Sequence, residues 1–271
     1  MPELPEVEIT RRGLAARLIG QRVVAAVVRD RRLRWPVPPE LEAQLTDATI
    51  TGIERRGKYL LFDFGHGYLL AHLGMSGSLR LLPSDTPARK HDHFDLLLDN
   101  ALIMRFTDPR RFGALLWLGS APDQHPLLVG LGIEPLGHAL NAQWLHRATR
   151  QGKLHLKLWL MDSHRITGIG NIYANEALFR AGVRPTRRAG TLTRKQCELL
   201  VAAIRETLNN AILAGGSTLR DFVGSDGNPG YFQQQYMVYG RAGEACRICG
   251  TAIKILRQGG RATFYCPACQ R

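Results

Sequence analysis

The chain has 271 residues and a formal net charge of +13, with 36 Lys and Arg against 23 Asp and Glu. No apolar run approaches the roughly 20 residues of a membrane-spanning helix, and the charged first segment does not resemble a signal peptide. We therefore expect a cytosolic protein with no membrane attachment, long enough for more than one hydrophobic core.

The positive charge is concentrated in the second half of the chain. Residues 1–149 hold 18 Lys and Arg against 16 Asp and Glu, whereas residues 150–271 hold 18 against 7. A basic half indicates a polyanionic partner, and nucleic acid is the first candidate. A merely basic surface stays an alternative. An anionic membrane is less well supported, because no basic amphipathic helix with a broad apolar face is visible.

The first segment, MPELPEVEITRRG, predicts a helix that begins near Pro5. Proline suits the first helical position, and the acidic residues that follow it favour the positive end of the helix dipole. Leu14 and Leu18 then recur at helical spacing. Pro2 and Glu3 lie before this helix and are not explained by it. Two interpretations stay open at this point: an ordinary helix start, or a terminus that takes part in the chemistry.

From residue 20 to about 118 the pattern is that of short strands. The runs lie at 23–28, 58–64, 68–74, 94–98, 101–106 and 114–118. The GHG sequence at 65–67 predicts a turn between two of them, and Asp99-Asn100 predicts a two-residue hairpin loop. Several short strands separated by turn signals favour a β-sandwich or barrel.

The second half of the chain changes to a helical period. The Gly- and Pro-rich segment 119–137 reads as a linker, and helices are expected near 141–149, 153–162, 171–181 and 194–213. Thr193 and Gln196 form a capping-box pattern at the start of the last helix. The segment 215–240 is Gly-rich and without a period, which is typical of a functional or disordered loop.

Four of the five cysteines form two Cys-x-x-Cys pairs separated by sixteen residues: Cys246, Cys249, Cys266 and Cys269. This is the spacing of a zinc site with four thiolate ligands, and such a site is structural because it has no open position for water. Disulfides are the weaker interpretation in a cytosolic protein. The fifth cysteine, Cys197, falls inside a predicted helix and is expected to be buried.

Between the cysteine pairs, two β-rich runs flank Gly259-Gly260 and predict a hairpin. Lys254, Arg257 and Arg261 are expected on or near its tip, where several cations favour contact with phosphate. The GIGN sequence at 168–171 precedes a predicted helix that Asn171 could cap. Free backbone N–H groups there would suit a phosphate, although a plain capped turn explains the sequence equally well.

Eight motifs in this order resemble those of bacterial formamidopyrimidine-DNA glycosylases. They are MPELPEVE, RRGKYL, HLGMSG, HDH, TDPRRFG, GIGNIYANE, SDGNPGYF and the four-cysteine finger, and they span almost the whole chain. A sister family, similar to endonuclease VIII, shares the Pro-Glu start and the finger. That family usually has Gly at the position of Leu4, so the resemblance is closer to the enzymes that act on oxidised purines.

The resemblance implies four catalytic residues. Pro2, freed by removal of Met1, would attack the sugar carbon C1′ through its secondary amine and form a cationic iminium. Glu3 would act as a general acid on the sugar ring. Lys58 would contact phosphate and assist elimination, and Arg261 would bind the phosphates beside the lesion.

The resemblance also implies the residues that contact DNA. Met75, Arg110 and Phe112 would fill the gap that the extruded base leaves, which offsets part of the cost of unstacking. Judged without the resemblance, Met75 and Phe112 would be core residues, but the glycines and prolines beside them indicate loops. The remaining DNA-contacting positions are His91, Lys153, Lys157 and Asn171.

The expected fold is α+β: an N-terminal β-sandwich with a leading helix (1–132), a helical helix–two-turn–helix domain with a lesion-recognition loop (133–240), and a zinc-finger hairpin (241–271). The implied protein is a monomer that binds duplex DNA with oxidised bases or abasic sites in a basic cleft between the domains. It would excise formamidopyrimidine and 8-oxoguanine and then perform β,δ-elimination. The alternatives are the same chemistry on oxidised pyrimidines, and a zinc-ribbon protein that binds DNA without cutting it.

Overall fold

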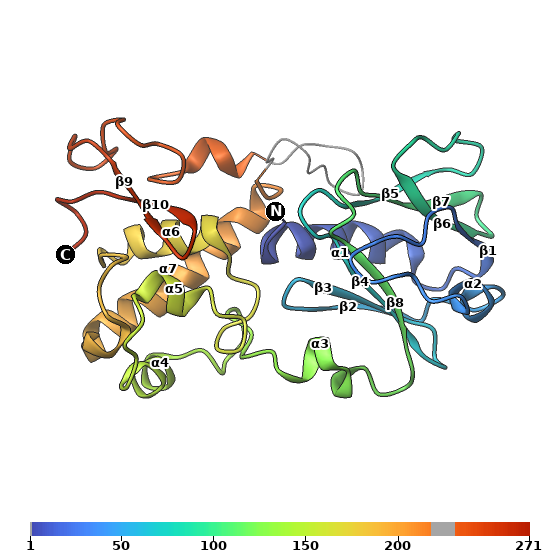
Figure 1. Ribbon diagram of the computed structural model, residues 1–271, viewed down its shortest axis with the longest axis horizontal. Helices are drawn as coiled ribbons and strands as arrows, with labels where there is room; N and C mark the ends of the chain where they lie inside the picture. The colour runs from blue at the N-terminus through green and yellow to red at the C-terminus, as the bar shows by residue number, and fades with distance from the viewer. Residues whose placement is uncertain (1, 218–230) are drawn as a thin grey trace. The chain divides into compact units, whose positions relative to one another are not determined.

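A computed structural model describes residues 2–217 and 231–271 and divides the chain into two compact units (Figure 1). Unit 1 consists of residues 1–129 and 214–233, and unit 2 of residues 130–213 and 234–271. The chain therefore leaves unit 1, builds most of unit 2 and returns to unit 1 after the long helix. None of the helices in the described ranges has the length and apolar character needed to cross a bilayer.

Unit 1 is a β-sandwich with one long helix. Its helices are α1 (Leu4–Leu18), α2 (Leu41–Leu45) and α3 (Pro126–Val129), with a 3-10 turn at Pro122–Gln124. Its strands are β1 (Val23–Val28), β2 (Gly52–Arg56), β3 (Tyr59–Asp63), β4 (Tyr68–His72), β5 (Ser78–Pro83), β6 (Asp92–Leu98), β7 (Leu102–Thr107) and β8 (Ala114–Leu118). They form two antiparallel sheets, in the orders β1-β6-β7-β5 and β2-β3-β4-β8.

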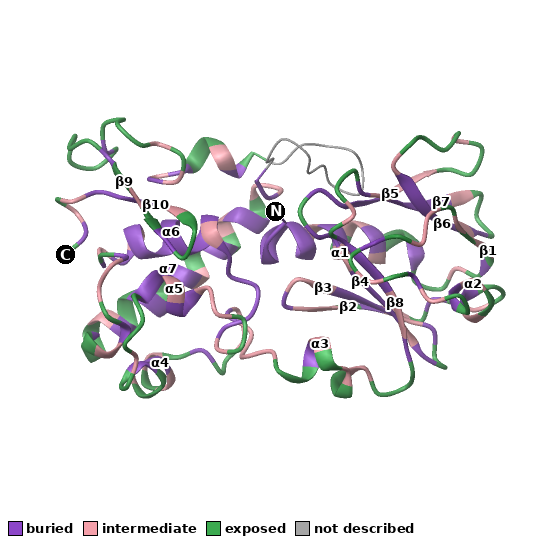
Figure 2. Ribbon diagram, viewed as in Figure 1, coloured by how far each residue is buried: buried purple, intermediate pink, exposed green. Residues whose placement is uncertain are grey.

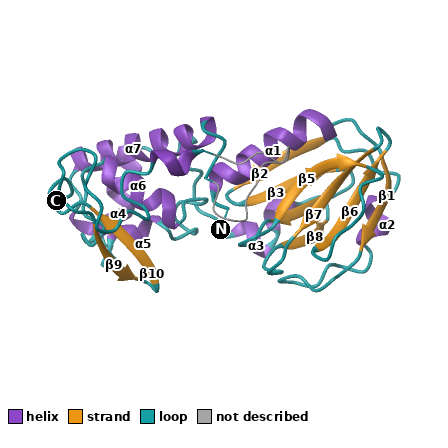
Figure 3. Ribbon diagram, turned by 90° about the horizontal axis from the view of Figure 1, so that it is seen from above, coloured by secondary structure: helices purple, strands orange, loops and turns teal. Residues whose placement is uncertain are grey.

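One hydrophobic core joins the two sheets and α1. Phe62 and Leu69 from one sheet, Phe94 and Phe106 from the other, and Leu14 from α1 belong to the same buried cluster. Because side chains alternate between the two faces of a strand, each sheet can present one apolar face to this core. Figure 3 shows the strands of unit 1 in orange with α1 lying along them. The predicted sandwich is confirmed.

The leading helix is held to the sheet by charge as well as by apolar packing. The carboxylate of Glu8 accepts hydrogen bonds from Arg11 and Arg12 on its own helix, and it forms an ion pair with Arg55 of β2 at 3.2 Å. Burial alone would raise the pKa of Glu8, but these arginines lower it to about 2. The start of α1 is buried (Figure 2), so this terminus is a fixed part of unit 1.

Unit 2 is helical and ends in a two-stranded hairpin. Its α-helices are α4 (Ala142–Thr149), α5 (Leu156–Leu160), α6 (Asn171–Arg180) and α7 (Arg194–Leu213), and 3-10 turns lie at Ala189–Thr191 and Phe232–Gln235, the latter spanning the boundary between the units. The hairpin strands are β9 (Lys254–Gln258) and β10 (Arg261–Tyr265). The capping box of α7 is confirmed, since Gln196 N donates to Thr193 Oγ1 and Thr193 N to Gln196 Oε1.

Several elements differ from the sequence-based expectation. The expectation omitted α2, β2 and β5, and the helix predicted over 153–162 is the shorter α5. The β6–β7 loop has three residues rather than two, because Ala101 adopts a left-handed conformation with φ +60°. The predicted linker contains the short helix α3, and the boundary between the units follows Val129.

Candidate active site and nucleic-acid interface

The segment that precedes α1 is buried and anchored. Pro2 is buried, and Glu3 is 2% exposed. The backbone N–H of Glu3 donates to Glu6 Oε2 at 2.8 Å, and the other carboxylate oxygen of Glu6 accepts from the backbone N–H of Ser217, also at 2.8 Å. The Glu3–Glu6 bond is part of a capping box in which Glu3 is the N-cap of α1, so the helix start does explain Glu3, contrary to the expectation from the sequence. Through Ser217, Glu6 also holds the segment at Gly216-Ser217. A simple helix start does not require this second connection.

Lys58 lies at one end of the sheet β2-β3-β4-β8. It occupies the tight turn Gly57-Lys58 between β2 and β3, in which Gly57 has φ +58°. His72 ends the neighbouring strand β4, paired with Tyr59 and Ala114. Burial, followed by the positive charges of Lys58 and Arg34, lowers the pKa of His72 to about 4. The imidazole is therefore neutral near pH 7, and its Nδ1 accepts from Gly74 N at 3.1 Å.

The loops after β4 and before β8 meet at the same end of this sheet. An added Cβ on Gly74 (φ +63°) would lie 2.4 Å from the Phe112 carbonyl carbon, so only glycine permits this close approach of the two backbones. Met75 on the first loop is 39% exposed and Phe112 on the second is 44% exposed. Two apolar side chains are thus presented to solvent from neighbouring loops, and the guanidinium of Arg110 lies 5.0 Å from the centre of the Phe112 ring.

Asp108 organises these two loops. It is fully buried, and its carboxylate accepts from Ser76 Oγ at 2.7 Å, Gly113 N at 2.8 Å and Arg110 N at 3.2 Å. The network explains Arg111, which adopts a left-handed conformation (φ +57°) within this tight loop. The role of Asp108 was not identified from the sequence. A carboxylate in a Thr-Asp-Pro turn is a signal for a loop of this kind, because Asp bonds nearby backbone N–H groups.

His91 lies directly before β6 and beside the same pair of loops. Its carbonyl oxygen accepts from Asp108 N at 3.0 Å, and its ring centre lies 6.5 Å from that of His93. His93 in turn places Nε2 2.8 Å from the Asp108 carbonyl oxygen. Unit 1 therefore brings together four of the sequence-predicted DNA contacts, which are His91, Met75, Arg110 and Phe112.

In unit 2 the four cysteines of the two pairs form a metal-binding cluster. Their sulfur atoms all lie within 4.8 Å of one another, with Cys249 and Cys266 3.5 Å apart and Cys246 and Cys269 3.9 Å apart. A tetrahedral zinc with Zn–S bonds of about 2.3 Å requires sulfur atoms about 3.8 Å apart. The donor set therefore fits zinc. Cys197 is buried on α7, as expected.

The hairpin that the cluster supports has the predicted two-residue tip. Gln258 pairs with Arg261, and both Gly259 (φ +55°) and Gly260 (φ +74°) adopt left-handed conformations. Arg261 is exposed directly after the tip. The expectation for Lys254 was wrong, because Lys254 pairs with Tyr265 at the opposite end of the hairpin.

The GIGN turn and the helix that follows it contact the hairpin. The predicted cap is wrong: Gly170 is the N-cap of α6, and Asn171 is the first helical residue. Asn171 Nδ2 donates to the Ala262 carbonyl oxygen of β10 at 3.0 Å. Lys153 is exposed in the turn before α5, whereas Lys157 on α5 is 0% exposed and also bonds to β10.

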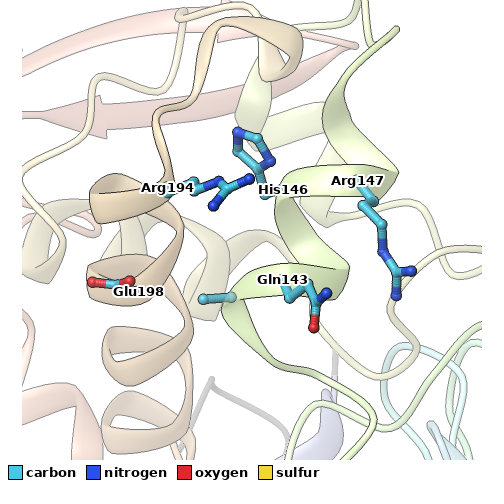
Figure 4. Close-up of a pocket in the computed structure, with 6 residues that line it drawn as sticks. Gln143, His146, Arg147, Arg194 and Glu198 are labelled. Atoms are coloured by element: carbon cyan, nitrogen blue, oxygen red, sulfur yellow. The ribbon is translucent and has the colours of Figure 1, made fainter.

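A separate cavity of about 400 Å³ lies between α4 and α7 of unit 2 (Figure 4). It is lined by Gln143, His146 and Arg147 from α4 and by Arg194 and Glu198 from α7. None of the predicted site residues lines it, so it is not part of the candidate active site. Half of the lesion-recognition loop expected within 215–240, residues 218–230, lies outside the described residues, as does Met1.

Three family models match the chain in succession. The Formamidopyrimidine-DNA glycosylase N-terminal domain matches residues 1–115, and the H2TH domain of the same enzymes matches residues 131–223. The zinc finger found in FPG and IleRS matches residues 243–271, which include all four clustered cysteines. The chain thus carries a four-cysteine zinc finger with one structural Zn²⁺, and its fold class is confirmed.

Whole-length relatives agree with these models. Formamidopyrimidine-DNA glycosylases of Thioalkalivibrio sulfidiphilus and Methylobacillus flagellatus are each 55% identical over 271 residues; all of this chain is covered, with 100% and 97% of the relatives. The crystal structure of a mutant Lactococcus lactis FPG with Fapy-dG-containing DNA superimposes with a TM-score of 0.92, at 33% identity and complete coverage of both chains. The MutM (FPG) protein of Thermus thermophilus gives a TM-score of 0.88 at 41% identity, covering 99% of this chain and 98% of that one. The chain therefore belongs to the formamidopyrimidine-DNA glycosylase family.

Proposed function

We propose that Pro2, Glu3, Lys58 and Arg261 carry the chemistry of this DNA repair enzyme, a glycosylase and abasic-site lyase that removes oxidised purines such as Fapy-dG from duplex DNA. The observation that carries the proposal is the burial of Pro2 and Glu3 together with the bond from Ser217 N to Glu6, since the Glu3–Glu6 bond itself belongs to the capping box of α1. A terminus that served only to start a helix would not need the connection through Glu6 to Ser217.

In the proposed mechanism, the Pro2 nitrogen attacks C1′ of the damaged nucleotide. The new N–C1′ bond forms as the bond to the base breaks, and the base leaves with that electron pair and takes up the proton that the Pro2 nitrogen loses. Glu3 then donates a proton to the ring oxygen as the sugar opens, which leaves a cationic iminium between Pro2 and C1′. The iminium accepts electrons when a proton is removed from C2′, and the 3′ phosphate departs; the 5′ phosphate leaves in the second elimination.

The cationic residues have complementary tasks in this proposal. Lys58, in a turn that restricts its backbone, contacts phosphate and assists the first elimination. Arg261, exposed beside the hairpin tip, binds the phosphates flanking the lesion and assists the second. Charge-assisted contacts to phosphate fix the register of a protein on DNA without reading sequence.

Base extrusion is assigned to the paired loops of unit 1. Met75 and Phe112, both exposed, would occupy the space of the extruded base, and Arg110 would contact the opposite strand beside Phe112. His91 and Lys153 would make further contacts to the DNA backbone, and Asn171 would do so through the Nδ2 hydrogen that is not donated to Ala262. As functional segments we propose 1–132 for catalysis, 133–240 for DNA binding and 241–271 for the zinc finger. We further propose a monomeric enzyme located in the bacterial cytoplasm with the nucleoid.

Covalent trapping on a panel of lesions tests this proposal. The panel holds duplexes with Fapy-dG, 8-oxoguanine, an oxidised pyrimidine, a ready-made abasic site or no lesion. Both purine lesions should give a borohydride-trapped complex, with the DNA remnant on Pro2 after peptide digestion. A tag fused before Pro2 should abolish trapping because an amide nitrogen cannot attack, whereas the same tag after Arg271 should not.

The outcomes separate the alternatives. A remnant on Lys58, or efficient trapping by the protein blocked at its N-terminus, would contradict the role of Pro2. Preference for the oxidised pyrimidine would favour the endonuclease VIII-like alternative, and a Lactococcus lactis Fpg has been crystallised with oxidized-pyrimidine-containing DNA. Binding of every duplex without turnover would favour a non-enzymatic zinc-ribbon protein.

A further inference from the structure

Lys157 on α5 is a charged side chain in an unusual position. Sequence resemblance assigns it to DNA contact, yet it is 0% exposed and is among the largest fully buried side chains. Burying a cation is costly unless it is strongly hydrogen-bonded. Its ammonium group donates to the Ala262 carbonyl oxygen at 2.9 Å and to the Thr263 hydroxyl at 2.7 Å, both on β10.

A second donor reaches the same carbonyl oxygen. Asn171 Nδ2, from the first position of α6, lies 3.0 Å from the Ala262 oxygen. A carbonyl oxygen has two lone pairs, so it can accept from both donors. The residue next to Arg261 is therefore held from two directions, by α5 and by α6.

The hairpin depends on such support. An isolated pair of strands is marginally stable in water, and β9 and β10 have no third strand among the described residues. Zinc holds the end that carries the cysteines, whereas the tip with Arg261 is at the other end. Along β10, Asn175 Oδ1 also accepts from Phe264 N at 2.8 Å, and Figure 1 shows the hairpin beside α6. On β10, the two bonds to the Ala262 carbonyl oxygen are the contacts nearest to Arg261, and on β9 the side chain of Gln258 lies 3.0 Å from His155 Nδ1.

We propose that Lys157, together with Asn171, is a positioning residue that fixes the backbone at Ala262 and thereby aims Arg261 at the phosphates. Lys157 would then act in the reaction through Arg261 and not as a phosphate ligand. The inference rests on the proposed role of Arg261. Displacing a catalytic group by about 1 Å can lower a rate about 10²-fold, so a small shift of the backbone at Ala262 would slow strand cleavage by moving Arg261.

A double-mutant cycle with zinc-loaded enzyme tests this role. Lys157→Met should slow cleavage of a ready-made abasic site by roughly 10- to 100-fold, while zinc content stays unchanged. In the Arg261→Ala background, Lys157→Met should change the rate of cleavage by less than about twofold, because Lys157 acts through the arginine that is absent there. Lys195→Met, which removes an exposed lysine from α7, is the matched control and should leave cleavage unchanged in both backgrounds.

Two further measurements keep the test decisive if Lys157→Met folds poorly. Thr263→Val removes one acceptor but keeps the ammonium group, and should show the same pattern with a loss of about three- to tenfold. Hydrogen exchange of the amides at 261–263 should accelerate roughly tenfold in either variant but not in Lys195→Met.

A phosphate ligand would behave differently. If Lys157 contacted a phosphate directly, Lys157→Met in the Arg261→Ala background would still reduce the magnitude of the slope of log affinity against log salt concentration by about 0.9. That result, or unchanged exchange at the hairpin tip, would overturn the positioning role. If Arg261→Ala alone leaves cleavage intact, the proposed function of Arg261 fails, and the exchange data still decide whether Lys157 holds the hairpin.

Discussion

At the scale of single residues, Glu6 shows how the terminus becomes a defined site. Its two carboxylate oxygens bind backbone N–H groups of Glu3 and Ser217, and the second partner is 211 residues away in the chain. An added Cβ on Gly216 (φ +79°) would lie 3.2 Å from Glu6 Oε1, so glycine suits this approach. From the sequence, the family resemblance gave Glu6 a supporting role in the site, and the helix dipole was the alternative explanation. The structure adds a link to the segment that leads into residues 218–230.

His72 provides a prediction about pH. Its pKa falls from 6.5 to about 4 on folding, chiefly by burial and then by the charges of Lys58 and Arg34. Between these two values the unfolded chain binds a proton that the folded protein does not, so stability decreases as the pH falls from about 6.5 to 4. At 1.36 kcal/mol per unit the loss approaches about 3 kcal/mol. Urea unfolding of the wild type and His72→Gln over this range should show a shallower decline in the variant, and equal slopes would contradict the assignment.

Phe112 provides a prediction about base extrusion. Because the ring is 44% exposed, Phe112→Ala should change the free energy of unfolding by less than about 1 kcal/mol. Unstacking a base costs a few kcal/mol, so excision of a lesion should fall about tenfold or more, with a smaller loss at a ready-made abasic site. Single-turnover rates on both duplexes measure this. Leu213→Ala, at an 83% exposed apolar residue, is the control, and equal losses on both duplexes would indicate a different role.

At the scale of elements, the paired loops at 73–77 and 108–113 behave as one structure built on Asp108. Asp108→Asn keeps one acceptor oxygen but turns an N–H donor toward Ser76 or Gly113 N–H. We expect a loss of about 2 kcal/mol or more in the free energy of unfolding, because buried donors lose their acceptor. Lesion excision should fall with it as Phe112 loses its fixed position. Chemical denaturation measures the first effect, and the exposed Asp85→Asn should leave both quantities unchanged.

The zinc finger gives a second prediction at this scale. Replacing Cys249 by Ser should release the metal and loosen the hairpin, because a small finger has little core without its ion. Metal analysis should then show less than one zinc per chain, and DNA affinity should fall because Arg261 loses its support. Cys197→Ala removes the cysteine of α7 and should retain full zinc content. Full DNA affinity in metal-free protein would refute the structural role.

At the scale of the whole molecule, the two units differ sharply in charge. Unit 1 carries 18 Lys and Arg against 17 Asp and Glu, whereas unit 2 carries 18 against 6. The charge difference between the two units is larger than that between residues 1–149 and 150–271, because residues 214–233 belong to unit 1. Electrostatic attraction to the DNA backbone should therefore come mainly from unit 2.

This contrast predicts a steep salt dependence of binding. Each neutralised phosphate contributes a slope of about −0.9 in a plot of log affinity against log salt concentration. Arg261→Ala should reduce the magnitude of the slope by about 0.9, as measured by fluorescence anisotropy with an abasic duplex. Arg147→Ala, which removes an exposed arginine from the α4–α7 cavity, should leave it unchanged. Equal changes in the two variants would indicate an undirected basic surface.

The sequence by itself determined the features that depend on neighbouring residues. The cysteine pairs, the Gly259-Gly260 tip and the capping box of α7 each lie within short segments, so local geometry and ligand spacing specify them. The succession of short strands before helices likewise predicted a sandwich or barrel followed by a helical domain, and the family resemblance selected the sandwich. Family resemblance added Pro2 and Glu3, which composition and periodicity left unexplained.

The tertiary structure alone decided where several polar side chains go. Lys157 finds its partner 105 residues later, and the carboxylate of Asp108 joins two loops that pairing across β4 and β8 brings together. Glu6 likewise depends on the chain returning to unit 1 after α7. A residue's type states which bonds it can form, but burial and long-range packing determine which partner is within reach. For that reason the family resemblance implied a DNA contact for Lys157, whereas in the fold Lys157 is buried against the strand that carries Arg261.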